Sequence, residues 1–284
     1  MKLLVFGKTG QVAQALRQCV IEAEFLGREQ ADLRDPDTCA RAIERFEGDA
    51  VLNLAAYTDV DDAEKDEATA HLVNATAPGR MAEAAALRDL PFLTVSTDYV
   101  FDGSGQAAWK VSDKPAPLNA YGRTKLAGEQ AVTAAQGDFV ILRTSWVFSP
   151  HGDNFVKTML RLSETRDELN IVSDQTGGPT FAGDIAASLV KIAQAMVDGR
   201  GTPGIYHYAG APSTSWADFA RAIFQKAERD VTVNDIPSAE FPTAAIRPQN
   251  SRLDCSALEA VFGITRPDWR AGLQRTLTEL KGNP

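Results

Sequence analysis

A chain of 284 residues is long enough to bury a large core in one or two domains. Its formal net charge of −9 argues against a general nucleic-acid-binding protein, whose surface would be basic. Three widely spaced cysteines without a Cys-x-x-Cys pair indicate neither a disulfide framework nor a zinc site, and no apolar run approaches the ~20 residues that cross a bilayer. We therefore expect a cytoplasmic protein with no nucleic-acid or membrane partner.

The first predicted element is a strand that leads into a glycine turn. Leu3–Phe6 is a short apolar run typical of a buried parallel strand, and the turn at 7–13 follows it before a helix expected over 14–20. Strand, glycine turn and helix form the context that a dinucleotide fingerprint requires. Gly7 permits the tight turn, and Gly10 lets the backbone approach a pyrophosphate. The spacing is Gly-x-x-Gly-x-x-Ala, so an ordinary strand-to-helix turn without a ligand is the alternative.

The residue that follows the second strand informs the choice of cofactor. Glu24–Leu26 is predicted as this strand, and the acid that usually binds the ribose 2′-hydroxyl of NAD is absent at its end. Arg28 stands there instead, and an arginine can accept the 2′-phosphate of NADPH. This pattern favours NADPH over NADH, with a solvated Arg28 as the alternative.

The third and fourth strands end in small and polar residues. Ala50–Tyr57 is predicted as the third strand and its exit, where small side chains leave room for a cofactor. The acidic run over 59–64 is interpreted as a solvated helix start rather than a metal site, since carboxylates suit a helix N-terminus. An alanine-rich helix over 67–87 precedes a fourth strand at 92–96. Thr97 follows it, at the carboxyl edge where open α/β sheets bind ligands.

The pattern with the most chemical content is a Tyr-x-x-x-Lys pair at the start of a helix. Asn119 is a predicted cap, and Tyr121 and Lys125 then lie on one helix face because they are four residues apart. A free tyrosine has a pKa of about 10, and a nearby ammonium would lower it and make the phenol a better general acid or base. Two unrelated surface side chains are the alternative, because the pair alone is a weak signal.

A fifth strand at 139–143 completes an alternation of strands and helices. This alternation predicts a doubly wound parallel α/β sheet of the Rossmann kind. The second half is less regular. We predict a dinucleotide-binding domain over 1–150, to which 170–200 returns, and a smaller, partly interleaved substrate domain mainly over 151–284. Its predicted elements are helices near 154–162, 184–197 and 216–227, strands at 170–174 and 204–208, and two short closing helices.

Several motifs together resemble an extended short-chain dehydrogenase/reductase: the Gly7–Ala13 turn, Ser96–Phe101 and Tyr121–Lys125. Further stretches make nearly the whole chain similar to the dTDP-4-dehydrorhamnose reductase family. This resemblance implies an enzyme that reduces the C4 ketone of dTDP-4-dehydro-6-deoxy-L-mannose to dTDP-L-rhamnose with NADPH or NADH. The further stretches are Phe6–Val12, Leu126–Glu129, Arg143–Val147, Asn154–Leu160 and Arg247–Leu253.

The resemblance also implies roles for single residues. Tyr121 would donate the proton to the ketone oxygen, Lys125 would hold the nicotinamide ribose and lower the pKa of Tyr121, and Thr97 would polarise the carbonyl or tune Tyr121. The substrate would contact Thr97, Asp98, Trp146, Arg247 and Asn250, although Trp146 could be a core residue and Arg247 a surface ion-pair partner. With Gly7, Gly10 and Arg28, the cofactor-binding set becomes Gly7, Gly10, Gln11, Val12, Arg28, Asp32, Leu33, Ala55, Ala56, Tyr57, Tyr121 and Lys125.

Two departures from the family pattern bear on assembly. Ala13 replaces the third glycine, which still permits close packing of helix on strand. Some family members dimerise through magnesium held by carboxylates, where this chain has Ala15 and Gly183. Magnesium bridging is therefore doubtful, no metal ligand is assigned, and the expected states are monomer and homodimer. Two other functions stay open: a non-catalytic NADP-binding regulatory subunit of the methionine adenosyltransferase type, and a related nucleotide-sugar epimerase or dehydratase.

Overall fold

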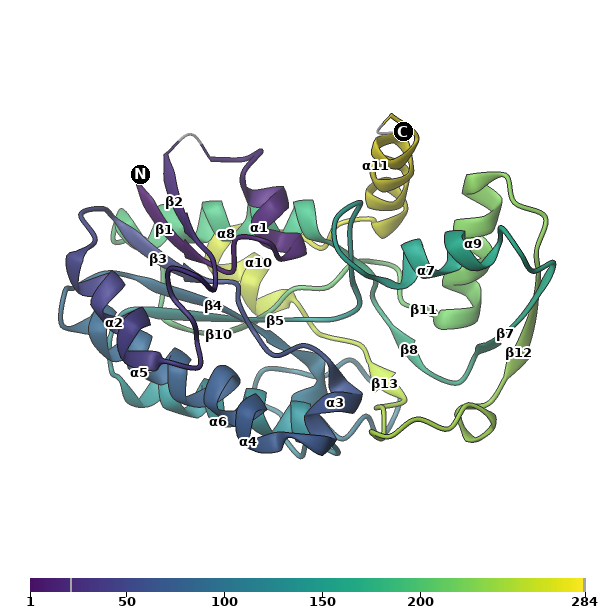
Figure 1. The fold of residues 1–284 in the computed structure, drawn as a ribbon, viewed down its shortest axis with the longest axis horizontal. Helices are drawn as coiled ribbons and strands as arrows, with labels where there is room; N and C mark the ends of the chain where they lie inside the picture. Colours follow the sequence, from purple (N-terminus) through teal and green to yellow (C-terminus); the bar gives the residue numbers. More distant parts are fainter. Residues whose placement is uncertain (21, 283–284) are drawn as a thin grey trace.

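A six-stranded parallel sheet forms the centre of the protein (Figure 1). The computed structural model describes residues 1–20 and 22–282. Neighbouring strands follow the order β10-β5-β4-β3-β1-β2, and every pair is parallel. The predicted doubly wound α/β sheet is therefore confirmed. Its strands are β1 Leu3–Phe6, β2 Ala23–Leu26, β3 Ala50–Asn53, β4 Phe92–Thr97, β5 Phe139–Thr144 and β10 Gly204–His207.

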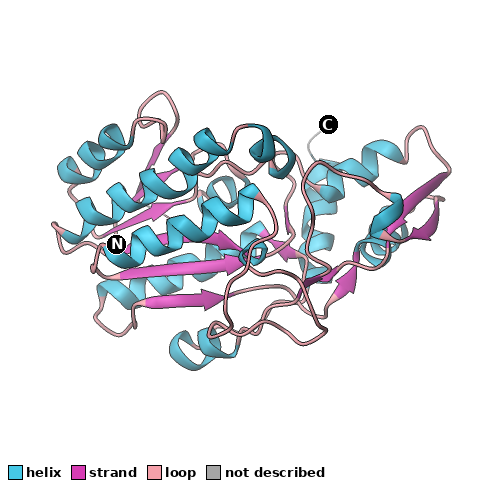
Figure 2. Cartoon of the chain, turned by 90° about the horizontal axis from the view of Figure 1, so that it is seen from below, coloured by secondary structure: helices cyan, strands magenta, loops and turns pink. Residues whose placement is uncertain are grey.

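Alternate residues of each strand bury against helices on opposite faces of the sheet. In β1, Leu3 and Val5 belong to one core, and Leu4 and Phe6 belong to the other. Figure 2 shows the strands of the sheet pointing toward the smaller part of the molecule, so their carboxyl ends face that part. The first core is covered by α1 Gln11–Leu16, α8 Ala182–Val197 and α10 Ser256–Phe262, and the second by α2 Pro36–Arg45, α5 Ala77–Ala86 and α6 Ala120–Ala134.

The helix predicted over 67–87 is interrupted. It consists of α4 Glu67–His71, a π-helical segment Leu72–Thr76 and α5, and it follows the short helix α3 Val60–Lys65. Asn74, in the π-helical segment, is 2% exposed, and its side chain accepts from the Tyr57 amide at 2.8 Å and donates to the Tyr57 carbonyl at 3.0 Å. This wider turn thus ties the helix to the exit of β3, a long-range contact that helical periodicity does not reveal.

The first helix also differs from its prediction over 14–20. α1 begins at Gln11 because Gly10 adopts the extended conformation of an N-cap, and it ends at Leu16. The glycine turn therefore leads into the helix directly after Gly10, and Gln11 and Val12 lie in its first turn. No helix in the described part of the chain is long and apolar enough to cross a membrane.

A smaller part, built mainly from the second half of the chain, lies beside the carboxyl edge of the sheet (Figures 1 and 2). Its own core includes Phe148, Phe219 and Trp269. Because α8, β10 and α10 return to the sheet, the second half contributes to both parts. The closing helix α11 is longer than predicted. The remaining elements are β6 Val147–Phe148, α7 Phe155–Leu162, β7 Glu168–Val172, β8 Thr176–Gly177, β9 Thr180–Phe181, β11 Thr214–Ser215, α9 Trp216–Ala227, β12 Thr232–Ile236, β13 Asn250–Ser251 and α11 Trp269–Gly282.

Candidate active site

The start of α6 lies against the carboxyl end of β4. Asn119 caps the helix as predicted, since its side chain accepts from the Gly122 amide at 2.8 Å. A Cβ atom at Gly122 would lie 2.2 Å from the Tyr99 carbonyl oxygen, so only glycine allows this close approach. The approach brings the first turn of α6 next to Thr97, the last residue of β4.

Tyr121 and Thr97 form the contact at the centre of this edge. The Thr97 side chain is 5% exposed and lies beside Tyr121, whose ring packs edge-to-face on Tyr99 with the centroids 5.7 Å apart. Burial raises the pKa of Tyr121 to about 12, while the side chain of Thr97 opposes this rise. Tyr121 therefore keeps its proton at neutral pH, which suits a proton donor.

Lys125 lies one turn further along α6 and is 6% exposed. Its Nζ donates to the Val95 carbonyl at 2.8 Å. Burial lowers the pKa of Lys125 to about 8, and the charge of Glu129 opposes that fall. The expectation that Lys125 lowers the pKa of Tyr121 is not met in this geometry, because burial of the phenol dominates and Lys125 is directed to a backbone carbonyl.

Asp98 follows Thr97 and is 3% exposed. Its Oδ1 accepts from the Thr97 hydroxyl at 3.3 Å, and its Oδ2 has no hydrogen-bond partner among the described residues. Burial raises the pKa of Asp98 to about 7, against a lowering influence of the Ser251 hydroxyl. Asp98 is therefore a carboxyl group that changes charge near neutral pH at the edge where Tyr121 lies.

The glycine turn after β1 lies close to the exit of β3. Gly7 has a φ of 91°, and a Cβ atom there would lie 2.8 Å from the Ala55 amide nitrogen, so both backbone conformation and space require glycine. The Gly10 amide closes the turn onto the Gly7 carbonyl at 2.9 Å. Of the predicted cofactor residues, Gly7 is thus brought next to Ala55, and Gly10 lies near the carbonyl of Leu54, the residue before Ala55.

Basic side chains gather where β2 ends. Arg28 is exposed, and no ion pair of Arg28 occurs among the described residues. Lys8 pairs with Glu29, and Arg34 pairs with Asp32 at 2.6 Å. Lys8 and Arg34 were not predicted, although both lie within a few residues of predicted positions.

Asp32 and Leu33, both predicted to bind the cofactor, lie in different surroundings. Hydrogen bonds from Arg34 lower the pKa of Asp32, whereas Leu33 is 7% exposed and packs into the core between the sheet and α2.

These residues fit a dinucleotide. The Lys125 ammonium carries three N–H donors, and among the described residues only the Val95 carbonyl accepts from it, so donors remain for the hydroxyls of a ribose. Gly7 and Gly10 present backbone without side chains, and the basic group at Lys8, Arg28 and Arg34 suits a phosphate.

A cleft of about 1480 Å³ borders this edge and runs along the smaller part. Tyr99 and Arg247 line it from the side of the sheet, and Phe155 and Trp216 line it from the smaller part. The cleft is large enough for an extended ligand of the size of a nucleotide sugar.

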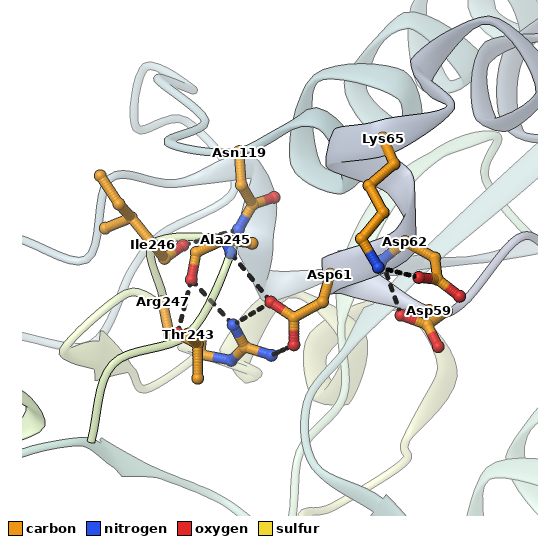
Figure 3. A network of polar contacts seen from close by, with 9 residues as sticks. All are labelled: Asp59, Asp61, Asp62, Lys65, Asn119, Thr243, Ala245, Ile246 and Arg247. Carbon is orange, nitrogen blue, oxygen red and sulfur yellow. Dashed lines mark hydrogen bonds and ion pairs between the residues drawn. The ribbon is translucent and has the colours of Figure 1, made fainter.

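Arg247 lies in the wall of the cleft and is paired with Asp61 (Figure 3). Its Nη2 is 2.6 Å from Asp61 Oδ2 and its Nη1 is 2.9 Å from Oδ1, while the Ala245 amide also donates to Oδ1 at 2.8 Å. The bonds from Arg247 hold the pKa of Asp61 at about 2. The acidic run at 59–64 is therefore more than a solvated helix start: Asp59 caps α3, but Asp61 joins α3 to the loop at 245–247.

Two predicted substrate residues have structural partners. Asn250 is 2% exposed, donates to the Ala107 carbonyl at 2.8 Å and accepts from Arg252, so its role at a diphosphate stays a prediction that this geometry does not favour. Trp146 is half-buried with a φ of 50° and stacks on Trp216, with the ring centroids 3.5 Å apart. Trp216 borders the cleft and was missed, since only its position after a helix cap was visible in the sequence.

Within the residues described, no group of three or more His, Cys, Asp or Glu side chains is placed to hold a metal ion.

Comparisons with known proteins agree over the whole chain. The sequence model of the RmlD substrate binding domain family matches residues 1–281. Proteins named dTDP-4-dehydrorhamnose reductase from Sinorhizobium fredii and Aggregatibacter actinomycetemcomitans are 44% and 41% identical, over 99% and 96% of this chain and 98% and 97% of their own lengths.

Solved structures give the same picture. A dTDP-4-dehydrorhamnose reductase from Bacillus anthracis in complex with NADP has a TM-score of 0.92 at 32% identity, covering 98% of this chain and all of that chain (100%). One from Clostridium acetobutylicum has a TM-score of 0.93 at 33% identity, covering 99% and 100%. A Thermus thermophilus UDP-glucose 4-epimerase with NAD shares the fold at 20% identity.

Proposed function

Because this chain belongs to the RmlD substrate binding domain family, whose relatives above are dTDP-4-dehydrorhamnose reductases, we propose that it reduces dTDP-4-dehydro-6-deoxy-L-mannose to dTDP-L-rhamnose. It is an NAD(P)H-dependent oxidoreductase. The observation that carries the proposal is the contact of Tyr121 with Thr97 beside the buried Lys125, between the glycine turn and the cleft. NADPH, when bound, supplies the hydride that reduces the C4 carbon.

Tyr121 is the proposed proton donor. Its raised pKa keeps the phenol protonated, and the side chain of Thr97 lies beside it. The Tyr121 O–H bond breaks as the ketone oxygen gains a proton, which leaves a phenolate. Lys125, on the same helix face, has ammonium donors left for the ribose hydroxyls and so holds the nicotinamide end of the cofactor beside Tyr121. Thr97 also donates to the ketone oxygen in the alternative orientation of its hydroxyl.

Other residues bind the two ligands. Arg28, with Lys8 and Arg34, supports a preference for NADPH over NADH through the 2′-phosphate. Trp146 is proposed to offer an aromatic face to the deoxysugar, and Asp98, beside Thr97, is proposed to contact the sugar. Arg247 binds the diphosphate by exchanging the carboxylate of Asp61 for a phosphate, two oxygens of which can accept the same pair of N–H donors. This arrangement assigns cofactor binding mainly to residues 1–150 and substrate binding mainly to 151–284.

The proposal is tested by following the absorbance of NADPH and of NADH with the keto-sugar nucleotide, for the wild type and for Tyr121→Phe. We expect oxidation by the wild type and a kcat lower by about 10²–10⁴-fold in the variant, since general acid catalysis contributes about that factor. A wild type that binds both ligands but oxidises neither cofactor would favour a regulatory subunit. Cofactor that stays bound through gel filtration would favour an epimerase or dehydratase, because a reductase must exchange its cofactor in every turnover.

A further inference from the structure

Three successive residues at the end of β4 each contact one position on a single face of α6. Thr97 lies beside Tyr121, the Val95 carbonyl accepts from Lys125 Nζ at 2.8 Å, and Ser96 between them donates its hydroxyl to Glu129 at 2.6 Å. Tyr121, Lys125 and Glu129 are spaced by four residues, so they share one face of the helix. The two groups of the proposed reaction and Glu129 thus belong to one contact between strand and helix.

Glu129 is held from the opposite side by an arginine of β5. Its Oε1 also accepts from Arg143 Nε at 2.9 Å, and its Oε2 accepts from Arg143 Nη2 at 2.6 Å. The two side chains are 3% and 2% exposed. A bidentate pair out of reach of solvent has one geometry, so the position of Ser96 relative to α6 is fixed.

The network ends at a neutral histidine. Arg143 Nη1 is 3.3 Å from His207 Nε2, and His207 Nδ1 is 3.0 Å from the Trp109 carbonyl. The carbonyl can only accept, so Nδ1 carries the proton and Nε2 accepts from Arg143. Burial, and then the charge of Arg143, lower the pKa of His207 to about 4. The histidine therefore adds no charge at neutral pH.

We propose that Glu129 is a positioning residue for the reduction: it fixes the end of β4 against α6, and its negative charge keeps the buried Lys125 protonated. This inference rests on the proposed function for its kinetic consequences. Lys125 alone would be a buried ammonium, which desolvation drives toward the neutral form. Glu129, one turn away, opposes that effect, and Arg143 holds the carboxylate of Glu129 in place at 2.6 Å.

The other charged groups near α6 have different partners. Asp98 at the end of β4 is directed to Thr97, and it is partly protonated near pH 7. Glu64 of α3 accepts from the Ala120 amide, and Glu67 of α4 pairs with Arg123 at 2.8 Å on the exposed side of α6. Arg143 of β5 and His207 of β10 face Glu129 rather than Lys125. Glu129 is thus the carboxylate whose charge acts on Lys125.

The first test measures the titration of Lys125 directly, without turnover. The Cε resonance of Lys125, in protein labelled with ¹³C-lysine and assigned by its loss in Lys125→Met, is followed against pH. We expect the midpoint in Glu129→Gln to lie about one pH unit below that of the wild type, because a buried neighbouring charge shifts a pKa by about that amount or more. Coincident titrations would overturn the proposal, whatever the activity of the protein.

Glu129→Gln leaves the buried charge of Arg143 unpaired, which destabilises the fold. A second variant therefore repeats the test without an unpaired buried charge. Glu129→Gln with Arg143→Met removes both charges and keeps apolar volume. We expect this folded double variant to show a downward shift of Lys125 that is smaller than in the single variant, because the positive charge of Arg143 is removed as well. A wild-type titration in the folded double variant would overturn the proposal, since the charge of Glu129 would then be without effect.

Kinetics separate positioning from charge. In Ser96→Ala the carboxylate stays but its bond to β4 is lost, so we expect kcat to fall about tenfold with the Lys125 titration unchanged. In Glu129→Gln we expect kcat to fall, and the basic limb of the pH profile of kcat to move to lower pH. The matched control Glu67→Gln breaks the exposed pair on the same helix, and its kcat should stay within about twofold. An unchanged kcat in Ser96→Ala would overturn the positioning role, whereas a wild type without reductase activity would overturn the proposed function and leave the titration as the test.

Discussion

Two bidentate arginine–carboxylate pairs join elements near the candidate site, and they differ in their exposure to solvent. Arg143 and Glu129 join β5 to α6 with side chains 2% and 3% exposed. Arg247 and Asp61 join the loop at 245–247 to α3 with side chains 22% and 37% exposed. Both have a shortest contact of 2.6 Å. The same chemical contact is therefore a fixed part of the core in one place and an exchangeable one at the cleft in the other.

The difference follows from solvent. Water competes for both partners of an exposed pair, so the pair separates at little cost and its arginine can bind another anion. A buried pair cannot be solvated when it is broken, so each partner depends on the other. This contrast agrees with the positioning role proposed for the Arg143–Glu129 pair and with the ligand binding proposed for Arg247.

The largest expected effect is a difference in stability between two variants, each of which removes one partner of a pair. Arg143→Ala should lower the free energy of unfolding by about 3–5 kcal/mol, because it leaves Glu129 buried without a counter-charge. Asp61→Ala should lower it by about 1 kcal/mol or less, since its pair is solvent-accessible. Urea denaturation of both variants measures this, and similar losses would mean that burial does not distinguish the pairs.

Asp98 extends the comparison, as a buried carboxyl group with no arginine. Its pKa is about 7 in the folded protein and about 3.9 in an unfolded chain, so its contribution to stability is complete below about pH 4 and is lost as the pH rises through 7. Between pH 5 and pH 8 we expect the wild type to lose on the order of 2 kcal/mol relative to Asp98→Asn. Asp102→Asn is the control in urea denaturation at both pH values, because the pKa of Asp102 is lowered instead. Equal pH dependence of wild type and Asp98→Asn would contradict the burial argument.

The proposed exchange of Asp61 for a phosphate at Arg247 predicts that substitutions of Arg247 and of Asp61 change KM in different ways. Arg247→Ala should raise the KM for the keto-sugar nucleotide about tenfold, as expected for a lost charge-assisted contact to phosphate. Asp61→Asn should leave KM unchanged or lower it, because the guanidinium is then released. Steady-state kinetics measure both values. If Asp61→Asn raised KM as much as Arg247→Ala, the pair would be shaping the cleft wall rather than supplying Arg247 to the ligand.

The smallest expected effect concerns the pKa of Asp61, the carboxylate of the exposed pair. Arg247 holds the folded pKa of Asp61 at about 2, below its unfolded value of about 3.9. The stability from this pair is therefore present above about pH 4 and is lost as the pH falls toward 2. The Cγ resonance of Asp61 should titrate near 2 in the wild type and closer to 4 in Arg247→Gln. Titration near 4 in both proteins would show that the pair does not persist in solution.

Much of the fold was predictable because short stretches of the sequence indicate its strands and helices. Short apolar runs predicted the strands, and Asn119 predicted the start of α6. The position of Thr97 at the binding edge of the sheet followed from the rule that open α/β sheets bind ligands at the carboxyl ends of their strands, whereas its relation to Tyr121 came from the family resemblance. These inferences needed only neighbours in sequence and the topology of a doubly wound sheet.

The missing parts are contacts that sequence spacing does not encode. Glu129 and Arg143 are 14 residues apart, and Asp61 and Arg247 are 186 apart, so spacing identified neither pair, although a surface ion pair was one of the two roles considered for Arg247. The direction of the Tyr121 pKa was wrong because a sequence does not reveal how deeply a phenol is buried. The interruption at Asn74 was missed because its partner, the Tyr57 backbone, lies on another element.

The stacked indoles of Trp146 and Trp216 also have an optical consequence. With ring centroids 3.5 Å apart and an interplanar angle of 11°, their electronic transitions couple, whereas isolated tryptophans absorb independently. The chain holds four tryptophans, and Trp216 of this pair lines the cleft. The protein therefore carries its own spectroscopic reporter: a circular-dichroism couplet that changes when a ligand moves Trp216, without any added dye.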